Sequence, residues 1–200
     1  MMSSVRKGEA RFLTGVARPG GYPAPAGPEV VFAGRSNVGK SSLLNALLRR
    51  KGLARVSKSP GRTQQINFFA TADLGIFVDL PGYGFARVPD KVRQQWKKLV
   101  DAYLEADRPV VMFLLLVDAR HEPSRQDVQM HDWLCQSDLP YRVVLTKSDA
   151  VRSAARAGAL RRAVDTLGLE DKNEAPLPVS IRTGKGLEQI RALIHQAVNG

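Results

Sequence analysis

This sequence lacks several features, and each absence excludes a class of protein. Its 200 residues include one cysteine, Cys135, so neither an intrachain disulfide nor a multi-cysteine metal site can form. The longest apolar run, 110–117, has eight residues, whereas a membrane-spanning helix needs about 20. The N-terminal residues contain no apolar stretch like that of a secretory signal. We expect a globular, cytoplasmic, monomeric protein with no membrane insertion, and the hydrophobic content of 44% agrees with this.

Acidic residues are missing from one long stretch, 30–63, which carries eight basic residues. The whole chain has 30 Lys and Arg against 19 Asp and Glu, a formal net charge of +11, so this stretch supplies most of the excess. A local positive field attracts phosphate-rich partners, whether nucleotide, RNA or anionic membrane. A merely solvated surface would predict a more even distribution of charge.

The order of the segments predicts an α/β domain behind a short extension. Residues 1–27 form an N-terminal extension, with an edge strand at 9–14 and a connector rich in glycine and proline. From 28 to 200, apolar and amphipathic segments alternate, which predicts a parallel, doubly wound sheet with helices on both faces. The expected strands are 30–33, 66–71, 75–79, 110–117, 141–145 and 177–179, and the expected helices are 40–50, 91–106, one opening at Ser124, 153–167 and 187–198.

A glycine-rich loop lies between the first strand and the first helix of that domain. Residues 34–41, GRSNVGKS, match the pattern G-x-x-x-x-G-K-[ST]. Backbone N–H groups in such a loop surround phosphates, Lys40 meets the β- and γ-phosphate charge, and Ser41 offers a hydroxyl to Mg²⁺. The loop predicts a nucleoside triphosphate site with Mg²⁺. Its residues are Gly34, Arg35, Ser36, Asn37, Val38, Gly39, Lys40 and Ser41.

A second motif, DLPG, ends the second apolar strand after this loop. The carboxylate of Asp79 can reach Mg²⁺ through water, and the Gly82 N–H can face the γ-phosphate. The motif adds Asp79, Leu80, Pro81 and Gly82 to the expected nucleotide site. The next residue is Tyr83, where Ras-type enzymes have a glutamine that orients the attacking water. We therefore expect slow intrinsic hydrolysis.

A third motif, TKSD, follows the strand at 141–145 and predicts the choice of base. Asp149 can accept hydrogen bonds from both N1–H and the 2-amino group of guanine, donors that adenine lacks. The loop after the last strand fits a backbone N–H contact with guanine O6. The residues of this part of the site are Thr146, Lys147, Ser148, Asp149, Val179, Ser180 and Ile181. Together the motifs predict a GTPase that binds GTP and GDP.

Five stretches resemble the EngB (YihA/YsxC) family of bacterial GTPases, in the TrmE–Era–EngA–EngB–septin group. They are 28–48, 59–69, 79–88, 118–127 and 145–149, and DLPGYGFA is especially typical of the family. The resemblance implies a Ras-like, mostly parallel sheet of six or seven strands. It also implies a role in maturing the large ribosomal subunit and in normal cell division and septation.

The resemblance further implies roles for residues of the first switch. Thr63 is the switch threonine on Mg²⁺, so the metal set is Ser41, Thr63 and Asp79. The first switch contributes Gly61, Arg62, Thr63, Gln64 and Gln65 to the nucleotide site. The sequence departs from the family at Ala150, where lysine is usual, and at Ile181, where a second serine is usual. A backbone contact with O6 would tolerate Ile181, whereas a side-chain contact would be lost.

Asn37 is a candidate for a second cation, because related GTPases with asparagine at this place bind K⁺ beside the phosphates. Its alternative role is that of a simple turn residue. With Asn37 the expected catalytic set is Lys40, Thr63, Gly82 and Asn37.

The leading hypothesis is a GTP-dependent assembly factor that docks on ribosomal RNA. Its RNA contacts would be the basic residues around the first switch: Arg49, Arg50, Lys51, Arg55, Lys58 and Arg62. The alternatives are solvated loop charge and, for the function, a switch acting on a protein partner in division. We expect three of the remaining side chains to be packing residues: Trp96, Trp133 and a buried Cys135. We expect His121, His131 and His195 to be surface or partly packed residues rather than metal ligands.

Overall fold

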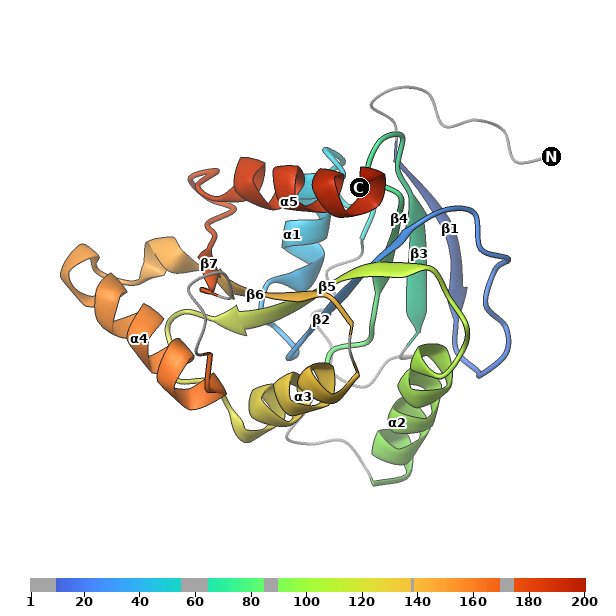
Figure 1. Ribbon diagram of the computed structural model, residues 1–200, viewed down its shortest axis with the longest axis horizontal. Coiled ribbons are helices and arrows are strands. Elements are labelled where there is room, and N and C mark those ends of the chain that lie inside the picture. The colour runs from blue at the N-terminus through green and yellow to red at the C-terminus, as the bar shows by residue number, and fades with distance from the viewer. Residues whose placement is uncertain (1–9, 55–64, 85–89, 138, 170–174) are drawn as a thin grey trace.

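The computed structural model describes residues 10–54, 65–84, 90–137, 139–169 and 175–200 (Figure 1). A seven-stranded sheet runs through the centre, in the order β1-β3-β4-β2-β5-β6-β7. The strands are β1 (Arg11–Val16), β2 (Glu29–Gly34), β3 (Ile66–Ala70), β4 (Ile76–Asp79), β5 (Val110–Asp118), β6 (Tyr141–Thr146) and β7 (Leu177–Pro178). The helices are α1 (Lys40–Leu47), α2 (Asp90–Leu104), α3 (Arg125–Gln136), α4 (Arg156–Leu167) and α5 (Leu187–Asn199).

The sheet is mostly parallel, as expected, with an antiparallel edge. Strands β4, β2, β5, β6 and β7 run parallel, while β3 is antiparallel to both β4 and β1. A tight turn reverses the chain between β3 and β4: the Thr71 hydroxyl donates to Gly75 O at 2.8 Å and accepts from Leu74 N at 2.8 Å. The edge is antiparallel because a five-residue turn can join only antiparallel neighbours, whereas a parallel connection needs a crossover of a dozen or more residues.

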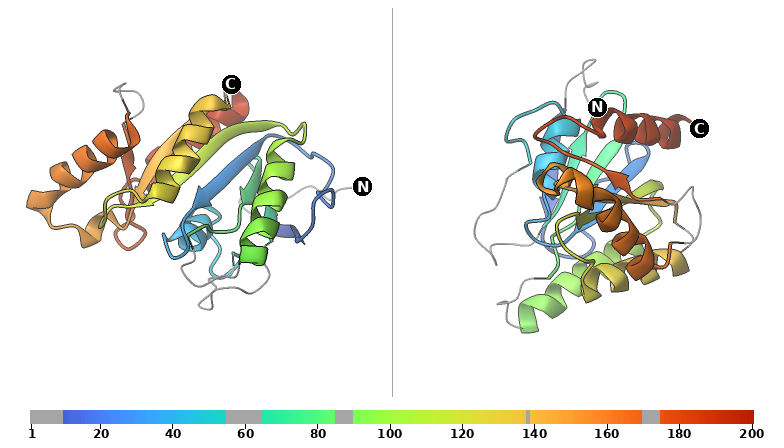
Figure 2. Two further views of the ribbon diagram at one scale, coloured as in Figure 1. Left: turned by 90° about the horizontal axis from the view of Figure 1, so that it is seen from below. Right: turned by 90° about the vertical axis from the view of Figure 1, so that its left-hand side faces the viewer.

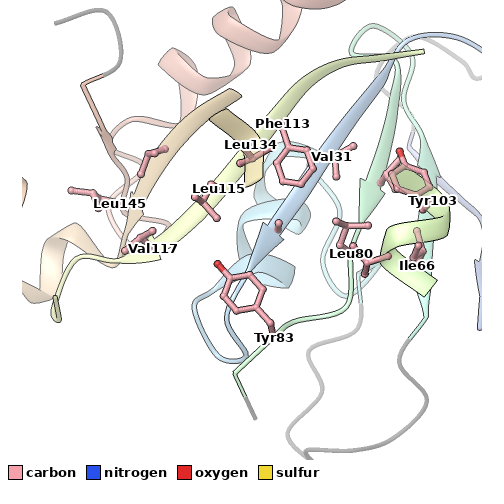
Figure 3. Close-up of a cluster of buried hydrophobic side chains, with 14 of the residues drawn as sticks. Val31, Ile66, Leu80, Tyr83, Tyr103, Phe113, Leu115, Val117, Leu134 and Leu145 are labelled. Carbon is pink, nitrogen blue, oxygen red and sulfur yellow. The ribbon is translucent and has the colours of Figure 1, made fainter. Parts of the chain in front are cut away.

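Helices cover both faces of the sheet, and each face has its own apolar core. In Figures 1 and 2, α1 and α5 lie on one face and α2, α3 and α4 on the other. The continuous apolar run predicted for β5 is buried because this strand lies between β2 and β6 with helices on both sides. Leu99 and Tyr103 of α2 are buried, and their spacing of four residues places them on one face of the helix. Figure 3 shows the core on this face, with Tyr103, Phe113 and Leu134 among its members.

Element ends depart from the expectations by a few residues. Helix α1 ends at Leu47 instead of 50, because Arg49 adopts a left-handed backbone conformation with φ 52°. Strand β1 begins two residues later than expected. Helix α3 starts as predicted, with a capping box in which Asp127 N donates to the Ser124 hydroxyl at 3.3 Å.

Packing within α3 corrects one expectation. Cys135 is exposed, not buried, because the inward face of the helix is formed by Asp127, His131 and Leu134, and residue 135 lies about 100° further round. Trp133 packs against the core beside Phe113, as predicted. The side chain of Trp96 lies outside the described part of the structure.

The connector before β2 is fastened at the amino end of the parallel strands. The Tyr22 hydroxyl donates to Leu99 O at 3.1 Å, and Arg108 Nη1 donates to Pro23 O at 3.1 Å. Arg108 also forms an ion pair with Glu29, the first residue of β2, and both side chains are buried. A segment with little regular structure is thereby held to the sheet by side-chain contacts.

Candidate nucleotide-binding site

The predicted motifs meet at one edge of the sheet. Strands β2, β4, β5 and β6 are parallel and end at Gly34, Asp79, Asp118 and Thr146. Their carboxyl ends therefore lie side by side, which is where open α/β sheets bind ligands. The loops after these strands carry the phosphate, DLPG and TKSD motifs.

The phosphate loop turns sharply into α1. Asn37 and Gly39 both have positive φ, 63° and 106°, and Gly39 O accepts from Leu43 N at 2.9 Å as the helix begins. In the described residues no side chain caps α1, and its first turn has no acidic residue. The first N–H groups of this helix are therefore open to an anion, and the macrodipole favours negative charge at the same place.

Lys40 and Asp79 are brought together from two motifs. Lys40 Nζ and Asp79 Oδ1 form an ion pair in which each side chain is 10% exposed. Asn67 Nδ2 donates to the other carboxylate oxygen at 3.3 Å. Ser41 follows Lys40 at the start of α1. A hydroxyl and a carboxylate are oxygen ligands that suit Mg²⁺, so this corner of the site fits that ion.

The segment after Asp79 lies against the phosphate loop. Tyr83 N donates to Gly34 O at 3.3 Å, and Tyr83 O accepts from Ser36 N at 2.8 Å. A Cβ atom at Gly82 would lie 3.1 Å from Ser36 N, so the close approach of the two loops favours glycine here. The Gly82 backbone is consequently held beside the residues expected to bind phosphate.

Tyr83 points away from this site into the core, as Figure 3 shows. Its hydroxyl donates to Asp127 Oδ1 at 2.8 Å, and Asp127 Oδ2 accepts from Ser124 N at 2.8 Å. Burial, the nearby Asp127 charge and this hydrogen bond together raise the pKa of Tyr83 well above its ordinary value. The sequence analysis did not foresee Asp127 as the partner of Tyr83, because the two residues are 44 positions apart.

The TKSD motif is tied to the phosphate loop by two side chains. The Thr146 hydroxyl donates to Val38 O at 2.6 Å, and Lys147 Nζ donates to Asn37 O at 2.5 Å. Lys147 Nζ also lies 2.9 Å from Asp118 Oδ2. Burial alone would raise the pKa of Asp118, but hydrogen bonds from Arg120 and Lys147 outweigh it and lower the pKa. The sequence analysis gave Asp118 no role, although its place at the end of a buried parallel strand was a usable signal.

Asp149 lies in a short 3-10 turn, Ser148–Ala150, facing the loop after β7. Its pKa is lowered by hydrogen bonds from Ser180 and then from Arg182, whose Nε lies 2.7 Å from Asp149 Oδ2. Ser180 N donates to Lys185 O at 3.0 Å, so of the two residues expected at guanine O6 Ser180 has its amide engaged within the loop. Arg182 was not foreseen, because its contact depends on the path of this loop.

Comparison with known proteins agrees with this geometry. A family model described as "50S ribosome-binding GTPase" matches residues 29–147. "Probable GTP-binding protein EngB" of Pelotomaculum thermopropionicum is 45% identical over 185 residues, which cover 92% of this chain and 93% of the relative. Its counterpart in Geobacter metallireducens is 49% identical over 160 residues, or 80% and 78% of the two chains. The chain belongs to the EngB family of GTP-binding proteins.

Solved structures confirm the fold of this EngB-family chain. A crystal structure of a probable GTP-binding protein EngB has a TM-score of 0.72 at 24% identity and covers 85% of this chain and 98% of its own. Aquifex aeolicus Era bound to GDP·AlF₄⁻ has a TM-score of 0.67 at 22% identity, with 86% and 57% covered. The expected Ras-like GTPase fold is confirmed, and membership of the EngB family makes the chain a GTPase that binds guanine nucleotides.

Several expected residues of the EngB-family site cannot be placed. Gly61, Arg62, Thr63 and Gln64, with the basic residues Arg55 and Lys58, lie outside the described part of the structure. Gln65 is described, and its side-chain amide lies against Gly15 of β1. The roles assigned to these residues therefore stay predictions.

The remaining candidate side chains are the three histidines. In the described ranges no group of three or more His, Cys, Asp and Glu side chains could hold a metal ion. His121 and His195 are exposed, whereas His131 is more buried than expected and its Nε2 lies 2.9 Å from the Tyr141 hydroxyl. Among the described residues, no helix has both the length and the apolar character needed to cross a bilayer.

Proposed function

We propose that this GTPase is an assembly factor of the large ribosomal subunit, with GTP controlling its attachment to ribosomal RNA. The observation that carries the proposal is the match of residues 29–147 to a family described by its binding to the 50S ribosome. The acid-free stretch 30–63 supports it, and Arg49, Arg50 and Lys51 in its described part are exposed just after α1. Assembly of ribosomes takes place in the cytoplasm, and a requirement in cell division and septation would follow from failed assembly.

The geometry supports a separate role for each motif in binding the nucleotide. The phosphates lie in the loop 34–41, where Lys40 exchanges its contact with Asp79 for the β- and γ-phosphate oxygens. The Gly82 N–H faces the γ-phosphate, Asp149 reads N1–H and the 2-amino group of guanine, and the Ile181 amide faces O6. Ser41, Asp79 and Thr63 would hold Mg²⁺, which when bound neutralises phosphate charge.

Two substitutions separate the metal residues. Ser41 belongs to the preformed loop, so Ser41→Ala should weaken Mg²⁺-dependent binding of GDP and of a non-hydrolysable GTP analogue alike. Thr63 is expected to engage only with the γ-phosphate, so Thr63→Ala should spare GDP and weaken the analogue. Equal losses for both nucleotides in both variants, measured by calorimetry, would contradict these roles.

A K⁺ ion beside Asn37 is proposed as the source of extra positive charge during hydrolysis. Asn37 is exposed at the turn of the phosphate loop. Residue 83 is a tyrosine whose side chain faces the core, so it does not take the place of the glutamine that orients the attacking water in Ras-type enzymes. Phosphate release should be faster in K⁺ than in Na⁺, and Asn37→Ala should abolish the difference while GDP affinity stays nearly constant. Equal wild-type rates in the two salts would refute the cation site.

Sedimentation with ribosomal subunits tests the function itself. The protein should travel with the large subunit in the presence of a non-hydrolysable GTP analogue and be released with GDP. Binding through several Lys and Arg contacts should weaken steeply between 50 and 200 mM salt, by about a thousandfold for six phosphate contacts. A nucleotide-dependent complex with a protein of the division machinery, insensitive to salt and independent of ribosomes, would favour the alternative: a switch acting on a protein partner in division.

A further inference from the structure

The loop after β7 places Arg182 on the carboxylate expected to read guanine. Arg182 Nε donates to Asp149 Oδ2 at 2.7 Å, and the neighbouring Ser180 side chain helps to lower the pKa of the same carboxyl. The Ser180 hydroxyl also accepts from Thr183 N at 3.1 Å, so this short loop is built around it. Asp149 therefore has a fixed set of partners before any base is present.

A carboxylate has about four positions at which it can accept a hydrogen bond, two on each oxygen. Guanine needs two of them, one for N1–H and one for the 2-amino group. Arg182 takes one of the remaining positions, on Oδ2, and so limits how the carboxylate can turn. We propose that Arg182 is a positioning residue for guanine recognition, which with Ser180 fixes the rotation of the Asp149 carboxylate so that two free positions face the base.

The inference rests on the proposed reading of guanine by Asp149. The contact geometry favours positioning over competition with the base. Arg182 approaches through Nε alone, and its side chain is 73% exposed, so it reaches the carboxylate from the solvent side. A guanidinium that blocked the base would instead be expected to cover both carboxylate oxygens in a two-point contact.

Inosine diphosphate provides the probe, because hypoxanthine keeps N1–H and lacks the 2-amino group. The difference in affinity between GDP and inosine diphosphate, measured by calorimetry, gives the contribution of that amino group to binding. Neither diphosphate is a substrate for GTP hydrolysis, so turnover does not disturb the measurement. In Arg182→Ala the affinity for GDP should fall about three- to fivefold, the range expected for an exposed ion pair. The affinity for inosine diphosphate should fall less, so the preference for GDP narrows.

Lys185→Ala is the matched control. Lys185 is an exposed cation on the same loop, and no described hydrogen bond joins its side chain to Asp149. Its loss changes net charge equally and should leave the GDP preference at the wild-type value. Arg182→Lys keeps the charge without the planar guanidinium and should recover only part of the preference.

Salt provides a second measurement that a purely structural role would not affect. Raising NaCl from 50 to 500 mM screens an exposed ion pair. The wild-type preference for GDP over inosine diphosphate should therefore fall toward the value of Arg182→Ala as the salt concentration rises. The preference of the variant should not change with salt. Thermal melting by circular dichroism confirms that the compared proteins are folded.

Three results would overturn the proposal: an unchanged preference in Arg182→Ala, tighter GDP binding by that variant, or an equal narrowing in Lys185→Ala. Asp149→Asn separates this inference from the proposed function. If that variant fails to exchange GDP for xanthosine diphosphate, the reading by Asp149 is itself wrong. If it makes the exchange while Arg182→Ala changes nothing, only the role of Arg182 fails.

Discussion

Ion pairs lie at both ends of the parallel strands, and they differ in burial. At the amino end, Glu29 and Arg108 have side chains that are 1% and 6% exposed. The Tyr103 hydroxyl donates to Glu29 Oε2 at 2.8 Å, and the Arg108 guanidinium lies 5.3 Å from the centre of the Phe68 ring. This pair has all its partners within the protein.

At the carboxyl end the ion pairs are Lys40–Asp79, Lys147–Asp118 and Arg182–Asp149, and all are more exposed than the buried pair. The Arg182 and Lys147 side chains are 73% and 29% exposed, and pairs open to solvent contribute about 0–1 kcal/mol, so these two cations can exchange a protein partner for a ligand at little cost. Lys40 and Asp79 are each only 10% exposed, so their contact can be replaced only by a ligand that supplies charge in its place. Removing one member of a buried pair leaves an uncompensated charge and costs about 3–5 kcal/mol. The amino end is thus built for stability and the carboxyl end for binding, and substitutions at the two ends should separate these properties.

The largest effect on binding is expected at the carboxyl end, on the choice of base. Asp149→Asn presents an amide donor where guanine also has donors, so GDP affinity should fall by about 100-fold or more and xanthosine diphosphate should become the preferred ligand. Thermal stability should change little, because Asp149 lies outside the core. Calorimetry with both nucleotides measures the change, and Asp165→Asn on the exposed face of α4 is the control for lost charge. A wild-type ratio of the two affinities would show that Asp149 does not read the base.

The amino end should show the opposite pattern. Arg108→Ala leaves Glu29 buried without its cation, so the free energy of unfolding should fall by about 3–5 kcal/mol. Nucleotide affinity should stay within twofold of wild type, because the loops that bind it lie at the other end of the strands. Urea unfolding and calorimetry measure the two quantities. Lys97→Ala removes a cation from the exposed Lys97–Asp101 pair and should cost less than about 1 kcal/mol.

Tyr83 stands at the carboxyl end of the strands, but its side chain is buried in the core, so it sharpens the comparison. Tyr83→Phe removes one hydrogen bond to the buried Asp127, which should cost about 1–3 kcal/mol of stability and leave GTP hydrolysis within twofold. Tyr83→Gln should also destabilise the core and should not raise hydrolysis, because a side chain at 83 faces away from the phosphates. Urea unfolding and phosphate release measure both variants. A tenfold gain in hydrolysis by Tyr83→Gln would mean that this side chain can turn to the nucleotide.

The sequence predicted the carboxyl end better than the amino end, for a physical reason. The phosphate loop and TKSD are contiguous motifs whose local conformation and strand-end position bring their residues together. The pair between Glu29 and Arg108 joins residues 79 positions apart, and no local pattern marks it. The antiparallel β3, the exposed Cys135 and the contacts of Asp118, Asp127 and Arg182 likewise depend on strand pairing or on the path of a loop. Such contacts become visible only once the fold has placed the segments.

The smallest effect we expect is a change in acid stability from Asp118. Hydrogen bonds from Arg120 and Lys147 hold the pKa of its carboxyl below the ordinary value of 3.8. The unfolded chain therefore takes up a proton at this residue at higher pH than the folded protein, so the stabilisation is present above about pH 4 and is lost as the pH falls. Between pH 5 and pH 3, wild-type stability should fall more steeply than that of Asp118→Asn, by an amount on the order of 1 kcal/mol. Urea unfolding across this range measures the two slopes. The variant should keep some acid sensitivity, because the lowered pKa of Asp149 acts in the same direction; parallel curves for the two proteins would show that the contacts of Asp118 contribute nothing to stability.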